Sequence, residues 1–147
     1  MSSERFLVRV AVYLMLIKNN KILLARRFNV DWMNGKYSLI AGHLDGNESV
    51  SQAIIREAKE EAGIKIKKND LELATVIHRM EPDLEYIDIF FVCKKWIGNP
   101  TIMEPDKCDE TSWFPLNALP KEVLSYVRKA ISNYKNDIIF SETGHTT

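Results

Sequence analysis

Residues 42–64 read GHLDGNESVSQAIIREAKEEAGI, and this segment carries most of the information about the expected structure and chemistry. Its middle predicts a helix over residues 49–62, because Ser49 with Gln52 fits a capping box at the start. Gly63 then stands where the end of a helix favours a residue in the left-handed conformation. The sequence therefore indicates both ends of this helix.

Three carboxylates share one face of the predicted helix. At about 100° per residue, Glu57, Glu60 and Glu61 lie together, while the apolar Ile54 and Ala58 lie on another face. Like charges on neighbouring turns destabilise a helix, and a bound cation would offset their repulsion. Hard oxygen ligands select Mg²⁺ or Mn²⁺ over zinc. A solvated acidic face is the alternative interpretation of this pattern taken by itself.

The rest of the chain alternates between strand patterns and helix patterns. Strands are expected at 6–17, 21–27, 37–41, 71–79, 85–96 and 112–114, with Asn19-Asn20 as the turn of a first hairpin. A second helix is expected at 121–134, with Val123, Leu124, Val127, Ala130 and Ile131 on one side. Residues 28–48, 80–84 and 99–110 should be mainly loop, and 141–147 a tail with little to bury. This order predicts an α/β or α+β fold, in which a mixed β-sheet is sandwiched between helices.

Length and composition fit one domain over residues 1–147. The chain has 147 residues, of which 46% are hydrophobic and 27% charged, and its formal net charge is zero. These values disfavour a disordered chain and leave no overall basic surplus for wrapping nucleic acid. Two cysteines, Cys93 and Cys108, are too few for a disulfide scaffold and favour reduced thiols. The apolar run 10–17 is too short to cross a bilayer, so we expect a cytoplasmic protein with no membrane partner.

Residues 42–64 resemble the Nudix box, G-x5-E-x7-R-E-U-x-E-E-x-G-U, where U is an apolar residue. The seven fixed identities are matched by Gly42, Glu48, Arg56, Glu57, Glu60, Glu61 and Gly63, and the apolar positions by Ala58 and Ile64. From average residue frequencies, a chance match to the seven identities in such a chain is below about one in a million. The chain is thus similar to the Nudix (MutT-like) hydrolases, although Ile40-Ala41 stand where many members have Pro-Gly.

The resemblance implies a Nudix-type mixed sheet between helices and Mg²⁺-dependent hydrolysis of a nucleoside diphosphate linked to another group. Mn²⁺ is the alternative ion. By position, Glu57, Glu60 and Glu61 would face the metal, and the backbone carbonyl of Gly42 would join them. Glu57 would either ligate the metal or act as general base, since family members differ on this assignment.

The resemblance also implies roles for the other residues of the box. Glu48 and Arg56 would form an ion pair that holds the loop on the helix, and Arg56 is placed among the catalytic residues with Glu57 and Glu60. Gly63 would have a structural role at the end of the helix. Divalent ions neutralise charge on a diphosphate and acidify a bound water, which a carboxylate can position or deprotonate.

An acidic residue in a later loop completes the site in many family members. The candidates here are Glu104, Asp106, Asp109 and Glu110. We rank Glu110 first, because it lies three residues before Trp113 at the mouth of an expected strand. A solvated acidic loop is the alternative for each of them.

Four residues outside the helix are candidates for binding substrate. Arg27, next to Arg26 at the end of a strand, could reach a phosphate. His43 follows the glycine of the box, and His78 lies near a strand end. Tyr86 could stack on a base. The alternative for each is a structural or solvated side chain.

The choice of substrate lies outside the box in this family. ADP-ribose hydrolases often carry a proline about 16 residues after the glycine that matches Gly63, and diadenosine polyphosphate hydrolases a tyrosine in that region. Residues 77–81 read IHRME and contain neither, which leaves a nucleoside triphosphate, with an intact or a damaged base, as the default small-molecule partner. The alternatives are an ADP-ribose or other dinucleotide pyrophosphatase, a non-catalytic nucleotide-binding module, and an RNA-end hydrolase, which zero net charge disfavours. The sequence does not decide the oligomeric state, and a homodimer is one alternative.

Overall fold

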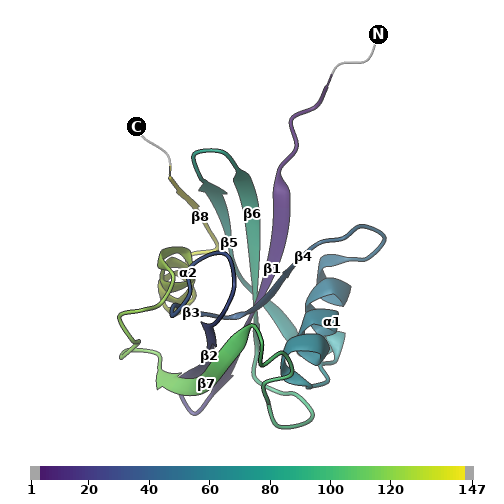
Figure 1. Cartoon of the computed structure of the whole chain (residues 1–147). Coiled ribbons are helices and arrows are strands. Elements are labelled where there is room, and N and C mark those ends of the chain that lie inside the picture. Colours follow the sequence, from purple (N-terminus) through teal and green to yellow (C-terminus); the bar gives the residue numbers. More distant parts are fainter. Residues whose placement is uncertain (1–3, 145–147) are drawn as a thin grey trace.

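The computed structural model describes residues 4–144, and Figure 1 shows its elements along the chain. The strands are β1 (Arg9–Lys18), β2 (Lys21–Arg27), β3 (Tyr37–Ser38), β4 (Ile40–His43), β5 (Leu71–Met80), β6 (Glu85–Cys93), β7 (Cys108–Pro115) and β8 (Phe140–Thr143). The helices are α1 (Val50–Ala62), α2 (Ser125–Lys135) and a short 3-10 helix, Lys68–Asp70. None of the described helices is both long and apolar enough to cross a membrane.

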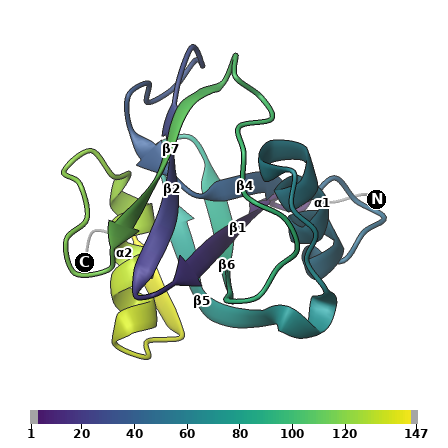
Figure 2. The ribbon, with the colours of Figure 1, turned by 90° about the horizontal axis from the view of Figure 1, so that it is seen from below.

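A mixed β-sheet forms the middle layer, with α1 on one side and α2 on the other (Figure 2). The strand order is β3-β2-β1-β6-β5-β8, and β4 and β7 pair in addition with β1 and β2. β1 is parallel to β6 and β5 is parallel to β8, whereas the remaining pairs are antiparallel. The expected fold class, a mixed sheet between helices, is confirmed.

The central strand β1 is buried on both faces, which explains its nearly continuous apolar sequence. Tyr13 and Met15 belong to the core on the α2 side, together with Val127. Leu14 belongs to the core on the α1 side, together with Ile54. Because successive side chains of a strand point to opposite faces, one strand anchors both helices.

Helix α1 begins and ends as its sequence predicts. The Ser49 hydroxyl accepts from the backbone N–H of Gln52 at 3.1 Å, and the Gln52 side chain accepts from the backbone N–H of Ser49 at 2.8 Å. Gly63 follows the helix in the left-handed region, with φ of 69°. The capping box and the glycine end are therefore confirmed. The hairpin between β1 and β2 is confirmed as well, because Asn19 and Asn20 both have positive φ, as a tight two-residue turn requires.

The first and fifth of the expected strands, at residues 6–17 and 85–96, are shorter than the sequence pattern suggests. β1 begins at Arg9, whose partner on β6 is Tyr86, so the expected start at residue 6 is wrong. Phe6 and Leu7 are 73% and 85% exposed because they lie beyond the ends of the neighbouring strands. β6 ends at Cys93 rather than at residue 96.

Helix α2 begins at Ser125, four residues later than expected. The backbone N–H of Tyr37 donates to the carbonyl of Glu122 at 2.7 Å, and the N–H of Leu124 donates to the carbonyl of Tyr37 at 3.0 Å. These bonds hold residues 122–124 extended beside β3, so they replace the first turn of the expected helix. The expected apolar side, Val123, Leu124, Val127, Ala130 and Ile131, is buried as predicted.

Two other segments are more ordered than their sequence indicates. β7 covers Cys108–Pro115 instead of residues 112–114 alone, because it pairs with the whole of β2. Residues 140–143 form β8 parallel to β5, a strand that was not expected where the sequence indicates only a tail with little to bury. Residues 145–147 of that expected tail lie outside the described residues.

Candidate active site

Arg56 is the centre of an ion-pair network that connects the loop before α1 with the carboxylate face of α1. Its Nε and Nη2 donate to the two carboxylate oxygens of Glu48 at 3.1 and 2.7 Å, a bidentate arrangement. Its Nη1 donates to Glu57 at 2.6 Å and to Glu60 at 3.3 Å. The guanidinium lowers the pKa of Glu48 below its usual range, mainly through these hydrogen bonds. The structure therefore brings together Glu48 and Arg56 and connects them to two carboxylates of the helix face.

Gly42 on β4 is where the sheet meets the carboxylate face of α1. A Cβ at Gly42 would lie 2.6 Å from Cγ of Glu57 and would overlap its carboxyl group, so no larger residue fits without moving Glu57. The Glu57 side chain is only 12% exposed. Strand β4 and helix α1 thus pack so closely that the backbone of Gly42 lies against this carboxyl group.

Glu61 lies beside Glu57, deeper in the protein. Its Oε1 accepts from the backbone N–H of Ala41 at 3.3 Å. Burial, a hydrogen bond with Glu57 and the charges of Glu57 and Glu104 together raise the pKa of Glu61 to about 9. Two carboxyl groups in contact, one of them buried, hold a proton or require a cation between them.

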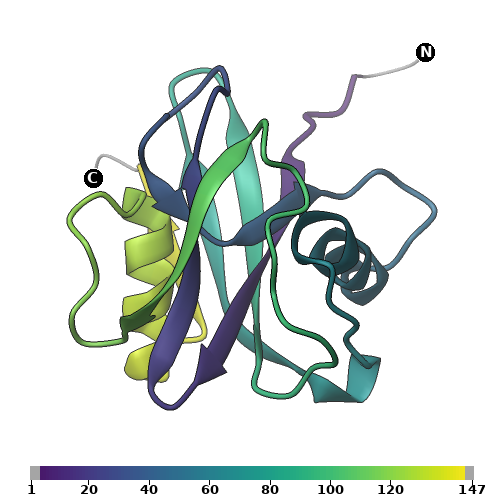
Figure 3. The ribbon, with the colours of Figure 1, turned by 60° about the horizontal axis from the view of Figure 1, so that its bottom comes forward.

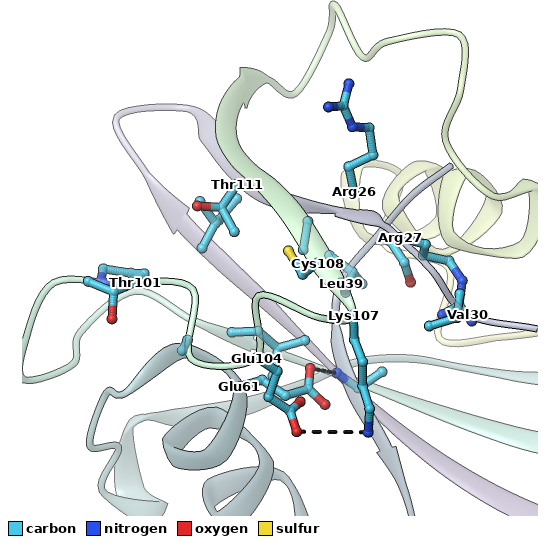
Figure 4. A pocket seen from close by; sticks show the side chains of 17 residues that line it. Arg26, Arg27, Val30, Leu39, Glu61, Thr101, Glu104, Lys107, Cys108 and Thr111 are labelled. Carbon is cyan, nitrogen blue, oxygen red and sulfur yellow. Dashed lines mark hydrogen bonds and ion pairs between the residues drawn. The ribbon is translucent and has the colours of Figure 1, made fainter. Parts of the chain in front are cut away.

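A first cavity of about 250 Å³ opens next to Glu61. Figure 4 shows Glu61 from α1 and Glu104 from the segment after β6 with their carboxylates directed toward the same place, and Lys107 beside them. Lys107 Nζ lies 4.0 Å from Glu104. The segment is fixed to the end of α1, because the backbone N–H of Thr101 donates to the backbone carbonyl of Ala62 at 3.0 Å and that of Met103 donates to the backbone carbonyl of Glu61 at 3.3 Å.

The other acidic candidates lie elsewhere. Glu110, ranked first from the sequence, accepts a hydrogen bond from the Tyr37 hydroxyl and lies outside the lining of the first cavity. Asp109 is paired with Arg26 at 2.8 Å, and Figure 4 shows Arg26 directed away from Glu61 and Glu104. Glu104 is therefore the acid of residues 104–110 that this fold brings next to the Nudix-box carboxylates.

A second, larger cavity of about 590 Å³ lies on the other side of β4. Its lining includes Gly42 and His43 of β4, and Ala41, Ser38 and Arg27 line both cavities. Aromatic rings form much of its wall, since Tyr13, Trp32, Tyr86 and Tyr126 all border it. The rings of Trp32 and Tyr126 are nearly parallel, with centroids 6.3 Å apart.

A buried arginine lies in the wall of this second cavity. The guanidinium of Arg79 lies 4.1 Å from the ring centre of Tyr86 and 4.0 Å from that of Tyr126. Its Nε donates to Asp88 at 2.7 Å, and Asp88, which is fully buried, also accepts from the Tyr13 hydroxyl at 3.0 Å. This network fixes the aromatic side chains around the cavity.

Three of the four residues predicted to bind substrate line a cavity. Arg27, His43 and Tyr86 all border the second one, and the guanidinium of Arg27 lies 5.4 Å from the ring centre of Trp32. His78 lies outside the lining of both cavities, and its Nε2 is 3.0 Å from Glu85. Trp32, Arg79 and Tyr126 could not be predicted from the sequence as cavity residues, because no local pattern indicates that three such distant segments meet.

The chemistry of the donors decides whether a divalent cation fits here. Within residues 4–144, no three acidic, histidine or cysteine side chains converge at metal-ligand spacing in this conformation, in which Arg56 contacts both Glu57 and Glu60. The buried contact between the carboxyl groups of Glu57 and Glu61 nevertheless offers only hard oxygen donors, which suit Mg²⁺. A cation there would favour the ionised form of Glu61, so these residues fit the ion that the box implies.

Comparisons with known proteins agree with this architecture. A family model, the NUDIX domain, matches residues 7–134. An ADP-ribose pyrophosphatase of Methanocaldococcus jannaschii is 33% identical over 125 residues, which are 85% of this chain and 72% of the relative. An NAD-capped RNA hydrolase NudC of Pseudomonas aeruginosa is 26% identical over 110 residues, and the chain spans only 37% of its length.

The fold comparison gives the same answer. The crystal structure of a MutT NUDIX hydrolase from Burkholderia pseudomallei superposes with a TM-score of 0.80 at 26% identity, covering 86% of this chain and 98% of that one. The expected fold and the resemblance of residues 42–64 are both confirmed. With the family model covering most of its length, the chain belongs to the Nudix hydrolase family.

Proposed function

We propose that this protein hydrolyses the diphosphate bridge of a nucleoside diphosphate linked to a second group, in a reaction that requires Mg²⁺. One observation carries the proposal. The carboxyl groups of Glu57 and Glu61 lie side by side against β4, between two cavities that share Ala41. A substrate bridge crossing β4 at this point would place its phosphates at the carboxylates and one end in each cavity.

The metal-binding residues in this proposal are Glu57, Glu60 and Glu61 with the carbonyl of Gly42. Mg²⁺, when bound, neutralises charge on the diphosphate and acidifies a water molecule. Arg56 acts as a positioning residue, because it contacts Glu57 and Glu60 directly and is itself fixed by Glu48. No covalent intermediate with the protein is needed, since placement and charge are enough for this type of transfer.

Glu104 is our candidate for the later acidic residue that completes the site. It shares the first cavity with Glu61, and its charge acts on the Glu61 carboxyl group. From this place a carboxylate could orient the attacking water or accept its proton. Lys107, which also borders the cavity, would attract a phosphate.

The two cavities differ in a way that suggests which end of a substrate each one takes. The second cavity has aromatic walls and is the larger, so it suits a nucleobase, which binds by stacking. The first is smaller and bordered by charged side chains, so it suits a polar group such as a sugar. Arg27 borders both and is placed to contact a phosphate between them.

This arrangement favours a nucleoside diphosphate sugar over the nucleoside triphosphate that the sequence motifs favour. The nucleobase of a triphosphate would occupy the second cavity, and no sugar would occupy the first. The ADP-ribose pyrophosphatase that shares 33% identity with this chain supports the same choice. We therefore propose ADP-ribose, or a related nucleotide sugar, as the first substrate to test.

A panel of nucleotides tests the proposal. ADP-ribose, nucleoside triphosphates and diadenosine polyphosphates are incubated with Mg²⁺ or Mn²⁺ and the products are identified by mass. Release of AMP and ribose phosphate from ADP-ribose, at a kcat/KM above that for any triphosphate, is the expected result. Faster release of pyrophosphate from a triphosphate would return the choice to the nucleoside triphosphate.

Variants separate an enzyme from a nucleotide-binding module. Glu61→Gln should abolish Mg²⁺-dependent turnover, and Glu104→Gln should slow it. Asp106→Asn, an exposed change two residues away, is the matched control and should leave the rate unchanged. A wild-type chain that binds nucleotide but never turns over any member of the panel would contradict the proposal and favour the binding module.

A further inference from the structure

A third hollow lies apart from the carboxylates, where the ends of β1 and β6 lie near Trp113 in the last part of β7. It has a volume of about 550 Å³, and three lysines and two tryptophans line it: Lys18, Lys94, Lys95, Trp96 and Trp113. We call it the lysine–tryptophan cleft. Gly98, Asn99 and Pro100 complete its lining.

The two tryptophans form a rigid aromatic surface in this cleft. Their rings are nearly parallel, with an interplanar angle of 13° and centroids 6.0 Å apart. Both side chains are half-buried and pack against the core on the α1 side, so their orientation is fixed by the fold. A flat ligand stacking on such a surface loses little entropy in the protein, because the rings do not have to be ordered.

The charge of the cleft has one sign. Lys18, Lys94 and Lys95 are all exposed, and among the described residues its lining contains no acidic side chain. The formal net charge of the whole chain is zero. The positive charge of these three ammonium groups is therefore local and does not reflect an excess of basic residues over the whole chain. The ligand that complements the cleft carries several negative charges and at least one aromatic ring.

The cleft continues toward the candidate active site. Pro100 lines both the cleft and the first cavity, and Thr101 lines that cavity next to it. The segment that carries them runs beside α1 (Figure 3) and is held there by the bond from Thr101 to Ala62. A flexible anionic chain leaving the first cavity would therefore pass over Pro100 into the cleft.

We propose that the lysine–tryptophan cleft binds single-stranded nucleic acid. The lysines would contact successive phosphates and the tryptophan pair would stack with a base, the combination by which proteins bind single strands without reading sequence. Binding at the cleft does not depend on the proposed hydrolysis. Only the direction of the strand, with its 5′ end toward the first cavity, rests on the proposed function.

Salt dependence gives the expected size of the effect. Each phosphate neutralised on a single strand contributes a slope of about −0.7 in a plot of log K against log salt. Three lysines therefore predict binding about 20-fold weaker at about 200 mM than at about 50 mM salt. Stacking predicts in addition a quenching of tryptophan fluorescence on binding.

The experiment measures binding of a labelled, unstructured oligoribonucleotide of about ten uridines by fluorescence anisotropy. The double variant Lys94→Glu with Lys95→Glu should weaken binding at low salt and reduce the salt effect to about threefold. Lys129→Glu, on the exposed side of α2, is the control: it reverses the charge of a lysine outside the cleft and should bind like the wild type. Trp96→Phe should keep the salt effect and reduce the quenching.

Several results would overturn the proposal. They are the absence of binding by the wild type at low salt, equal weakening by Lys129→Glu, or equally tight binding of inorganic polyphosphate, which has no bases to stack. Tighter binding of a duplex than of the single strand would overturn it as well. These measurements need no turnover, so a protein that fails to hydrolyse ADP-ribose but binds the oligonucleotide would contradict only the proposed function.

Discussion

The substitution Gly42→Ala tests the contact on which the candidate site depends. The added Cβ would lie 2.6 Å from Cγ of Glu57, whereas 3.4 Å is the beginning of ordinary contact, so the Glu57 side chain has to move by about 0.8 Å or more. That shift changes the position of its carboxyl group relative to Glu61 and Arg56, which it contacts in the wild type. A misplacement of about 1 Å at reacting groups costs about 100-fold in rate, which corresponds to about 2.7 kcal/mol in the barrier.

The assay is the initial rate of Mg²⁺-dependent hydrolysis of the best substrate, together with thermal unfolding of the same samples. Gly46→Ala is the control, because Gly46 has φ of 87° and open space around its Cα. It should cost about 1 kcal/mol in stability through backbone strain and lower the Tm by about 3 °C, with kcat unchanged. Gly42→Ala should do the reverse, with a large loss in kcat and a small change in Tm. A folded Gly42→Ala variant that keeps kcat within about twofold of the wild type, or a Gly46→Ala variant that loses as much kcat, would contradict this prediction.

The remaining predictions concern stability and reactivity. Asp88→Asn should lower the free energy of unfolding by about 3 kcal/mol, because it removes the buried charge partner of the Arg79 guanidinium and leaves only the more exposed Glu81; a loss below about 1 kcal/mol in urea denaturation would show that the pair is not needed. Burial raises the pKa of the Cys108 thiol, so its alkylation by iodoacetamide, followed by mass, should accelerate about tenfold from pH 7 to 8, and a bound substrate should slow it because Cys108 lines the first cavity. Arg26 lowers the pKa of Asp109 through their hydrogen bonds, so this pair stabilises the fold fully above about pH 4 and loses its contribution as the pH falls through the lowered pKa. Asp109→Asn should therefore reduce the dependence of stability on pH in that acidic range, and an unchanged acid-unfolding profile would argue against the pair.

The local elements of the site could be predicted from the sequence because helical geometry relates residues only a few positions apart. Ser49 and Gly63 mark the ends of α1, and the spacing of Glu57, Glu60 and Glu61 places them on one face whatever the helix packs against. The family followed from the same short stretch, since its fixed identities stand at fixed distances along the chain.

The tertiary structure decided which distant residues join that face. The sequence could not decide whether Glu104 or Glu110 joins the carboxylates of α1, because the side to which a strand residue points depends on the register of its pairing. Here β7 pairs Glu110 opposite Arg26 and places it at Tyr37, while the segment before β7 brings Glu104 to Glu61. The sequence by itself determined the helix, its carboxylates and the family, because these depend on short-range spacing. The aromatic second cavity and the lysine–tryptophan cleft exist only because sheet pairing brings together side chains that lie far apart in the chain.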